Sequence, residues 1–253
     1  MHNKKFVLNP KIRFSSRVEN YIKYRPSYPP EIIIFLTEKG ILKKKSVIAD
    51  IGSGTGILSE IFLKNGNLVY GIEPNADMRK AGEKLLSKYS TFKSIDGSAE
   101  ETKLNDNSID LITAGQAFHW FDIEKTKSEF KRILKPTGYI ILIWNTRKKA
   151  NSEFSEEYEK FILEYAKDYK ETRKRQDNID KFIKYEKETF YNYQEFDFEG
   201  LKGRLLSASY IPLENDPIFD KMIKHLKEIF IKYQKNGLIR LEYDTEIYYG
   251  KLN

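Results

Sequence analysis

The chain has 253 residues, of which 40% are hydrophobic and 14% aromatic, enough for one large domain or two small ones and too many for wholesale disorder. It has no cysteine, which excludes disulfides, thiolate metal ligands and a cysteine nucleophile. Its apolar runs are too short to span a membrane, and no apolar signal core follows the N-terminus. We therefore expect a cytoplasmic protein with no membrane partner and no metal.

The formal net charge of +7 is concentrated in the first fifth of the chain. Residues 1–50 hold eleven Lys and Arg against four Asp and Glu, so the remainder is neutral overall. Such a segment is either solvated surface or a surface that meets an anionic partner. It favours nucleic acid less than an evenly basic coat would.

Short apolar strands and amphipathic helices alternate through the middle of the chain. Runs that are apolar on both faces are typical of parallel strands covered by helices. The alternation predicts a doubly wound α/β fold. The expected strands are residues 46–51, 67–72, 91–95, 108–114 and 139–144, and the expected helices are residues 55–63, 75–89 and 123–134.

The alternation stops after Asn145. Residues 146–202 are charged, and we expect them to be a helical insertion over the ligand face or beside it. Residues 205–211 and 238–249 are predicted to be strands, with a helix at 217–233 between them. This late pair of strands would close the sheet as an antiparallel edge.

A glycine-rich turn, Asp50-Ile51-Gly52-Ser53-Gly54-Thr55-Gly56, joins the first predicted strand to the first helix. Alternate glycines permit a tight turn and let backbone N–H groups approach a ligand. The nicotinamide fingerprint G-x-G-x-x-G does not fit, because Ile57 stands at its third glycine, and no phosphate-loop Gly-Lys-Ser/Thr follows. By itself the turn could also be purely structural.

The context favours a nucleoside ligand. Glu73 ends the second strand, where a carboxylate can accept hydrogen bonds from both hydroxyls of a ribose. Alone it could be a helix-entry charge, since Pro74 and Asn75 break the strand and cap the next helix. Two more loops, residues 96–100 and 115–120, leave the same predicted edge of the sheet, where they could hold an adenine and a reacting group.

Together these segments resemble the class I S-adenosylmethionine-dependent methyltransferases. The resemblance is strengthened by Gln116-Ala117-Phe118-His119-Trp120-Phe121 and Leu134-Lys135-Pro136-Thr137-Gly138. Within that superfamily, Phe14, residues 24–29 and residues 207–210 are similar to the small-molecule branch that includes trans-aconitate methyltransferases. The resemblance covers residues 46–145 well and residues 14–30 and 205–211 loosely.

The resemblance implies one domain with a seven-stranded, mostly parallel Rossmann-like methyltransferase sheet and an antiparallel edge. N-terminal lid helices would occupy residues 1–45, the cofactor-binding core residues 46–145, the helical insertion residues 146–202 and the sheet-closing part residues 203–253. The implied cofactor is S-adenosyl-L-methionine, and its product is S-adenosyl-L-homocysteine.

The resemblance also assigns roles to matching positions. The methionine part of the cofactor would be held by Asp50, Gly52, Ser53, Gly54, Thr55 and Gly56. Glu73, followed by Pro74, would take the ribose, and the adenine would lie between Asn75, Met78, Ser98, Ala99 and Glu100. The sulfonium would lie near Gln116 and Ala117, under a lid that includes Tyr24, Arg25 and Tyr28.

Methyl transfer would be a direct displacement in which the protein mainly aligns the reactants. A carboxylate acceptor needs no base, whereas His119 could take a proton from a hydroxyl or amine, or simply pack beside its aromatic neighbours. Phe118, Trp120 and Trp144 belong either to the core or to the wall of a substrate pocket. Arg25 either pairs with a carboxylate of cofactor or substrate or lies at the surface.

Three functions follow from these observations. The first is methyl transfer to a small molecule, with carboxylates among the candidate acceptors. The second is an RNA or protein methyltransferase that uses residues 1–50 as a docking surface. Gly115-Gln116-Ala117-Phe118 stands where amino-methylating nucleic-acid enzymes carry Asn/Asp-Pro-Pro-Tyr/Phe, which disfavours nucleic acid. The third is a cofactor-binding module without catalysis.

Overall fold

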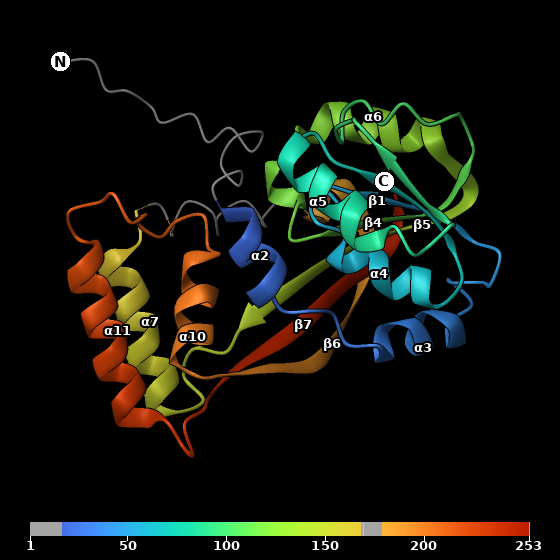
Figure 1. The fold of residues 1–253 in the computed structure, drawn as a ribbon. Coiled ribbons are helices and arrows are strands. Elements are labelled where there is room, and N and C mark those ends of the chain that lie inside the picture. The colour runs from blue at the N-terminus through green and yellow to red at the C-terminus, as the bar shows by residue number, and fades with distance from the viewer. Residues whose placement is uncertain (1–16, 168, 170–178, 253) are drawn as a thin grey trace.

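A computed structural model describes residues 17–167, 169 and 179–252. Its centre is a seven-stranded sheet in the order β3-β2-β1-β4-β5-β7-β6 (Figure 1). The strands are β1 (Val47–Ile51), β2 (Leu68–Ile72), β3 (Phe92–Ile95), β4 (Ile109–Gly115), β5 (Leu134–Arg147), β6 (Ile183–Phe196) and β7 (Ile239–Leu252). Pairings from β3 to β5 are parallel, and β7 is antiparallel to both of its neighbours. The predicted doubly wound sheet with an antiparallel edge is confirmed.

Helices cover both faces of the sheet and continue beyond its end. They are α2 (Val18–Tyr24), α3 (Glu31–Glu38), α4 (Ile57–Lys64), α5 (Ala76–Leu86), α6 (Ile123–Ile133), α7 (Glu153–Tyr165), α9 (Ile179–Phe182), α10 (Phe198–Leu206) and α11 (Phe219–Tyr233), with a 3-10 turn at Phe118–Trp120. Helices α5, α6, α7 and α10 begin at residues whose side chains cap them. The Asn75 side chain, for example, accepts hydrogen bonds from the backbone N–H groups of Asp77 and Met78.

Alternate residues of β5 enter two separate cores. Ile140, Leu142 and Trp144 pack on the face that α6 and α9 cover, whereas Ile141 and Ile143 pack on the face of α3 and α4. The strand is therefore apolar on both faces, as its sequence predicted.

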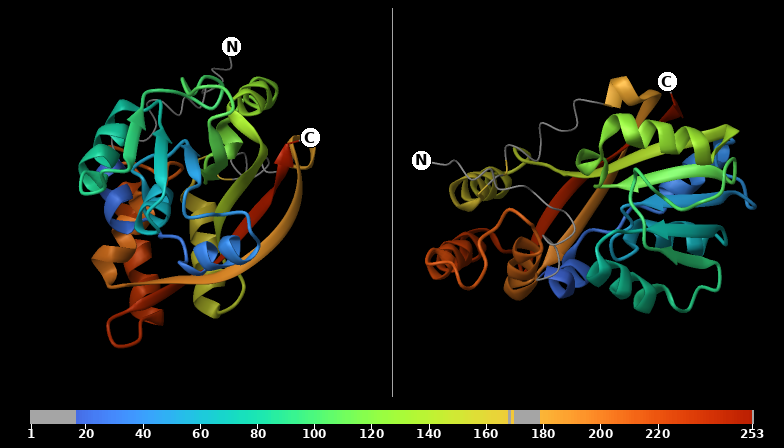
Figure 2. Two further views of the ribbon diagram at one scale, coloured as in Figure 1. Left: turned by 90° about the vertical axis from the view of Figure 1, so that its right-hand side faces the viewer. Right: turned by 90° about the horizontal axis from the view of Figure 1, so that it is seen from above.

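A third core lies beyond the sheet, among α7, α10 and α11, which we call the helical cap. Phe161, Leu205 and Leu226 each come from a different one of these helices and are fully buried there together with Leu241 and Tyr243 of β7. Figure 2 shows from other directions that the long strands β6 and β7 run from the body of the sheet to the cap. The cap is held on the sheet by a continuous β-ribbon.

The prediction that residues 146–202 are helical is wrong for residues 183–196, which form the edge strand β6. Phe190, Asn192, Gln194 and Phe196 share its more buried face, while its other residues are mostly exposed. Charged residues are common on edge strands because only one side pairs with a neighbour. The high charge therefore concealed a strand that pairs with β7 over its full length.

The predicted strand at residues 205–211 is also wrong. Residues 205 and 206 end the helix α10, which begins after Asp197 because its carboxylate accepts a hydrogen bond from Gly200 N at 2.7 Å, and residues 207–211 form turns and bends. The apolar residues Leu201 and Leu205 lie one helical turn apart and are fully buried against the cap. The sheet is closed by β7 and β6, and the prediction of β7 at residues 238–249 is confirmed.

No helix in the described part of the chain is both long enough and apolar enough to cross a membrane. Residues 1–16 and 170–178, which include Phe14 and much of the predicted N-terminal lid, lie outside the described residues.

Candidate functional site

The glycine-rich turn leaves the end of β1 in a conformation that depends on glycine. The φ angles of Gly52, Gly54 and Gly56 are 68°, 58° and 86°, in the left-handed region that side chains disfavour. A Cβ on Gly52 would stand 2.7 Å from Ala117 Cβ, and one on Gly56 would stand 2.4 Å from Leu86 Cδ1. The glycines therefore let the turn approach the end of β4 and helix α5.

Asp50, the last polar residue of β1, is completely buried at the base of this turn. Its two carboxylate oxygens accept hydrogen bonds from Ser59 Oγ at 2.6 Å and Thr113 Oγ1 at 3.2 Å. Burial raises the pKa of Asp50 to about 6, although the hydrogen bonds from Ser59 and Thr113 oppose that rise. A buried carboxylate at this position favours a cationic ligand group beside it.

Glu73 joins the end of β2 to the glycine turn. Its Oε2 accepts a hydrogen bond from Gly54 N, and its Oε1 accepts one from Asn75 N, both at 2.8 Å. The side chain is 8% exposed, and burial raises its pKa while the two backbone donors oppose that shift. Each oxygen keeps a second lone pair, so the carboxylate can still accept two hydroxyl donors.

The adenine-side residues of the prediction lie around the same strand ends. Asn75 and Met78 are buried at the start of α5, and Met78 Cε lies 3.4 Å from the position of a Cβ on Gly54. The Arg79 guanidinium donates to Glu73 O and to Asp96, so it ties this loop to the one after β3. In that second loop Ala99 is buried, and Pro74, Ser98 and Glu100 are partly exposed beside it.

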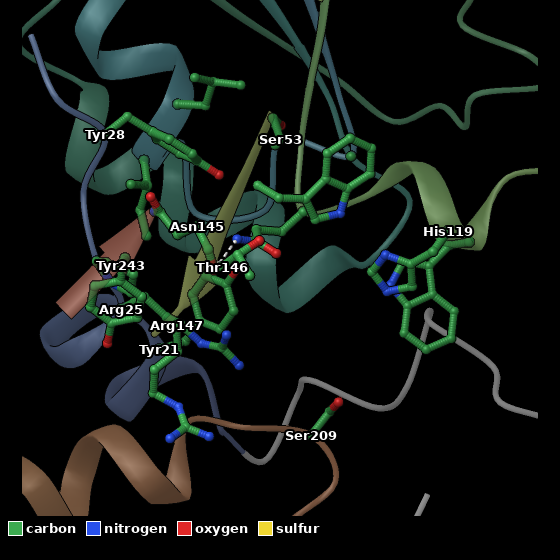
Figure 3. Close-up of a pocket in the computed structure, with 18 of the residues that line it drawn as sticks. Tyr21, Arg25, Tyr28, Ser53, His119, Asn145, Thr146, Arg147, Ser209 and Tyr243 are labelled. Atoms are coloured by element: carbon green, nitrogen blue, oxygen red, sulfur yellow. Dashed lines mark hydrogen bonds between the residues drawn. The ribbon is translucent and has the colours of Figure 1, made fainter. Parts of the chain in front are cut away.

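A cavity of about 420 Å³ opens beside the glycine turn (Figure 3). It is bounded by the ends of β1, β4 and β5 on one side and by residues of α2, α10 and β7 on the other. The predicted site residues that line it are Arg25, Tyr28, Asp50, Gly52, Ser53, Gln116, His119, Trp120 and Trp144. The cavity therefore unites the predicted sulfonium end of the site with part of the predicted lid.

The aromatic residues that the sequence left ambiguous separate into wall and core. His119 and Trp120 are partly exposed at the cavity with ring centroids 4.8 Å apart, whereas Phe118 is fully buried against Phe182 and Trp144. Trp144 is nearly buried but also lines the cavity. His119 is therefore a wall residue of the cavity, and Phe118 is core.

Two of the three predicted lid residues, Arg25 and Tyr28, line the cavity, and Tyr24 does not. The phenol oxygen of Tyr28 lies 2.5 Å from where a Cβ on Gly115 would stand, so glycine at the end of β4 makes room for it. Arg25 Nη2 donates to Ser207 O at 2.8 Å, and its Nε is buried without a partner among the described residues. Tyr24 packs on Gly203 and Phe196 instead, and it is not among the residues lining the cavity.

Two arginines that the sequence patterns did not single out also line the cavity. They are Arg147 at the end of β5 and Arg204 on α10. Tyrosines 21, 169, 210 and 243 line it with them. These residues lie outside the glycine turn and its neighbouring motifs, and only the folding of the cap onto the sheet brings them to the cavity. An arginine directly after a predicted strand end was the available signal for Arg147.

Residues 49–142 match the family model described as methyltransferase domain. This part of the chain, from β1 into β5, is similar to methyltransferase domains. An uncharacterized methyltransferase of Mycobacterium tuberculosis is 35% identical over 136 residues, which are 54% of this chain and 53% of that protein. One from Schizosaccharomyces pombe is 33% identical over 135 residues, 53% of each chain. The match spans about half the length of these curated relatives.

Solved structures resemble the methyltransferase domain together with the cap. A protein described as a candidate type II methyltransferase from Anaeromyxobacter dehalogenans superposes with a TM-score of 0.71 at 16% identity, covering 90% of this chain and 98% of that one. A candidate methyltransferase of an antibiotic biosynthesis pathway in Anabaena variabilis gives 0.55 at 22% identity, covering 91% and 99%. These likenesses establish the Rossmann-like methyltransferase fold.

Proposed function

We propose that this protein is an S-adenosylmethionine-dependent methyltransferase that acts on a small-molecule acceptor. The observation that carries the proposal is the hydrogen bond between Glu73 and Gly54, which joins the end of β2 to the glycine turn within the methyltransferase domain. A carboxylate and a glycine turn held together in this way suit a ribose and the chain attached to it.

The residues present fit the cofactor. Thr55 Oγ1 is buried beside the glycine turn with no hydrogen-bond partner among the described residues, so it is available to a polar ligand group. Asp50 would face the amino group of the methionine part, and Glu73 the ribose hydroxyls. Met78 and Ala99 would supply apolar contacts to the adenine.

When bound, the cofactor supplies a methyl group that its sulfonium activates. Transfer of that methyl group to the acceptor leaves a neutral thioether. The chain therefore needs to align the acceptor atom and to exclude water rather than to generate a leaving group. Gln116 is held for this by two hydrogen bonds, from its N to Ile143 O at 2.9 Å and from its Nε2 to Asn145 O at 3.3 Å. His119 would accept a proton if the acceptor is a hydroxyl or an amine.

The size and lining of the cavity favour a small acceptor, with carboxylates as the first class to test. A volume of about 420 Å³ is in the range of small-molecule sites. Two described basic residues of the N-terminal part are placed inside the fold rather than on an outer docking face. Arg17 is buried and donates to Leu206 O and Ile211 O, and Arg25 lines the cavity. These placements favour the small-molecule function over an RNA or protein acceptor.

Thermal unfolding with S-adenosylhomocysteine tests the cofactor assignment, with NAD and ATP as controls. Ligand at about 100 times its dissociation constant adds about 2.7 kcal/mol to the free energy of unfolding. For a chain of this length that corresponds to a rise in Tm of about 5–10 °C. A rise with NAD or ATP but not with S-adenosylhomocysteine would overturn the assignment.

Transfer of labelled methyl from S-adenosylmethionine to a panel of acids, phenols and amines then tests catalysis. We expect turnover on a small acceptor. Tight cofactor binding with no turnover on any panel member or cell extract would instead support the binding module without catalysis.

A further inference from the structure

Arg147 reaches the cavity with an unusual set of contacts. Its side chain is 11% exposed, its guanidinium lies 4.8 Å from the centre of the Tyr158 ring, and Nη2 donates to Glu159 at 2.5 Å. Nη1 is buried without a hydrogen-bond partner among the described residues. Glu159 is also shared, since Lys149 pairs with it at 2.9 Å. One carboxylate thus serves two cations, and a buried donor of Arg147 is left for a ligand.

Arg204 approaches the same place from α10. Its Nε donates to the Tyr243 hydroxyl at 3.2 Å and its Nη1 to Ser207 Oγ at 3.4 Å. Within the described part of the chain it forms no ion pair with a carboxylate. A guanidinium that is partly desolvated and bound only to neutral oxygens gains strongly from an anion.

The two arginines belong to one cluster. Arg147 and Arg204 both act electrostatically on Tyr158, and both are close enough to Tyr210 to interact with it. The Tyr210 hydroxyl forms no hydrogen bond with any described residue, and its ring packs on Tyr169 with centroids 4.8 Å apart. The described residues that line the cavity include three arginines, Arg25, Arg147 and Arg204, but only one carboxylate, Asp50.

Arg147 lies away from His119 across the cavity. Figure 3 places Arg25, Arg147 and Tyr243 at the side of the cavity opposite His119. An acceptor that reaches from one side to the other would present its reacting atom toward Gln116 and His119 and its remote end to the arginines.

We propose that Arg147 and Arg204, with the Tyr210 hydroxyl, bind an oxyanion of the acceptor that is not itself methylated. The group is a carboxylate or a phosphate, both of which accept paired N–H donors from a guanidinium. The inference rests on the proposed function. It specifies that the acceptor is anionic at its remote end and that the methylated product keeps that charge.

Calorimetric titration tests the subsite with glutarate and inorganic phosphate as probes and the neutral glutaramide as a matched control. Each is titrated into the protein saturated with S-adenosylhomocysteine, whose own binding is measured first. We expect Arg147→Gln and Arg204→Gln each to weaken binding of the preferred oxyanion by about ten- to a hundredfold. Binding of S-adenosylhomocysteine should change less than twofold. Comparison of the two probes shows whether carboxylate or phosphate is preferred.

Two further variants keep the test decisive. Arg240 lies on β7, is 49% exposed and pairs with Glu195 of β6, and it is not among the residues that line the cavity. Arg240→Gln should therefore leave the affinities for the oxyanion and for S-adenosylhomocysteine unchanged. The double variant Arg147→Gln, Glu159→Gln removes both buried charges, so it should fold even if Arg147→Gln does not, and it should show the same loss of oxyanion binding.

Three outcomes would overturn the subsite. Wild-type protein could bind S-adenosylhomocysteine but neither oxyanion, or bind glutaramide as tightly as glutarate. The arginine variants could bind the oxyanion as tightly as Arg240→Gln. If S-adenosylhomocysteine does not bind, the proposed function is wrong. The arginines would then not be an acceptor site, even if oxyanion binding depends on them. The cofactor titration alone distinguishes this last case.

Discussion

At the scale of single residues, the Glu73 carboxylate is where the strand end, the glycine turn and the proposed ribose site meet. Glu73→Ala removes the proposed acceptor for ribose hydroxyls and the partner of Gly54 N. Hydrogen bonds to a charged group contribute about 1.5–3 kcal/mol, so we expect S-adenosylhomocysteine to bind about ten- to a hundredfold more weakly by calorimetry. The exposed Glu124→Gln serves as control. Equal affinity in Glu73→Ala would place the ribose elsewhere.

Asp50 gives the stability of the protein a distinctive pH dependence. Its pKa is about 6 in the folded protein, mainly because of burial, and about 3.9 when unfolded. The folded state therefore binds the proton more tightly, and this group lowers the free energy of unfolding as pH rises from about 4 to 6.

The Asp50→Asn variant should lose this contribution. Between pH 4 and pH 7, the free energy of unfolding of the variant should rise relative to that of the wild type by about 2–3 kcal/mol. Urea denaturation at the two pH values measures the difference. Parallel behaviour of both proteins would mean that Asp50 titrates near its ordinary pKa.

The places of the glycine turn and of Glu73 in the fold could be predicted from the sequence because both follow strand ends. Asp50, Gly54 and Glu73 occupy fixed positions relative to β1 and β2, and those strands were visible as apolar runs. Arg147 and Arg204 could not be predicted in the same way. They are 57 positions apart, one at the end of β5 and one on α10, and the fold brings both to the cavity.

At the scale of elements, β5 inside the sheet was easier to predict than the edge strand β6. β5 is apolar on both faces because both are covered, whereas β6 is mostly exposed and carries Lys and Glu side chains that are equally compatible with a helix. Its pairing with β7 supplies stabilisation that does not appear in its own composition. Leu205 and Leu206 also suit a strand by composition, but they end the helix α10 that Asp197 caps.

The contact between α2 and α10 depends on the absence of a side chain at Gly203. A Cβ there would lie 2.0 Å from Tyr24 Cε2, so Gly203→Ala must displace the Tyr24 ring. Overpacking of this kind costs about 1–3 kcal/mol. We expect faster hydrogen exchange in residues 18–24 and a lower Tm, with Lys202→Ala on the same helix as control. Unchanged exchange would show that the Tyr24 ring moves without loosening α2.

At the scale of the whole molecule, the net charge of +7 makes salt dependence informative. A small acceptor bound by two arginines should give a shallow dependence of log KM on log salt, with a slope of about 1–2. An RNA acceptor that contacts several phosphates would lose affinity with a slope of about 0.9 per contact. Methyl-transfer assays between about 50 and 200 mM salt separate the two. A slope of 5 or more would favour the RNA methyltransferase.

The ribbon of β6 and β7 has a consequence for how the specificity of this protein can change. The family match ends at residue 142, whereas Arg147 and Arg204 come later, one just beyond the match and one on the cap that the ribbon carries. Mutations that exchange one acceptor for another can therefore accumulate on the cap while the glycine turn stays intact. On the proposed function, the cap is the part to exchange when a new acceptor is wanted.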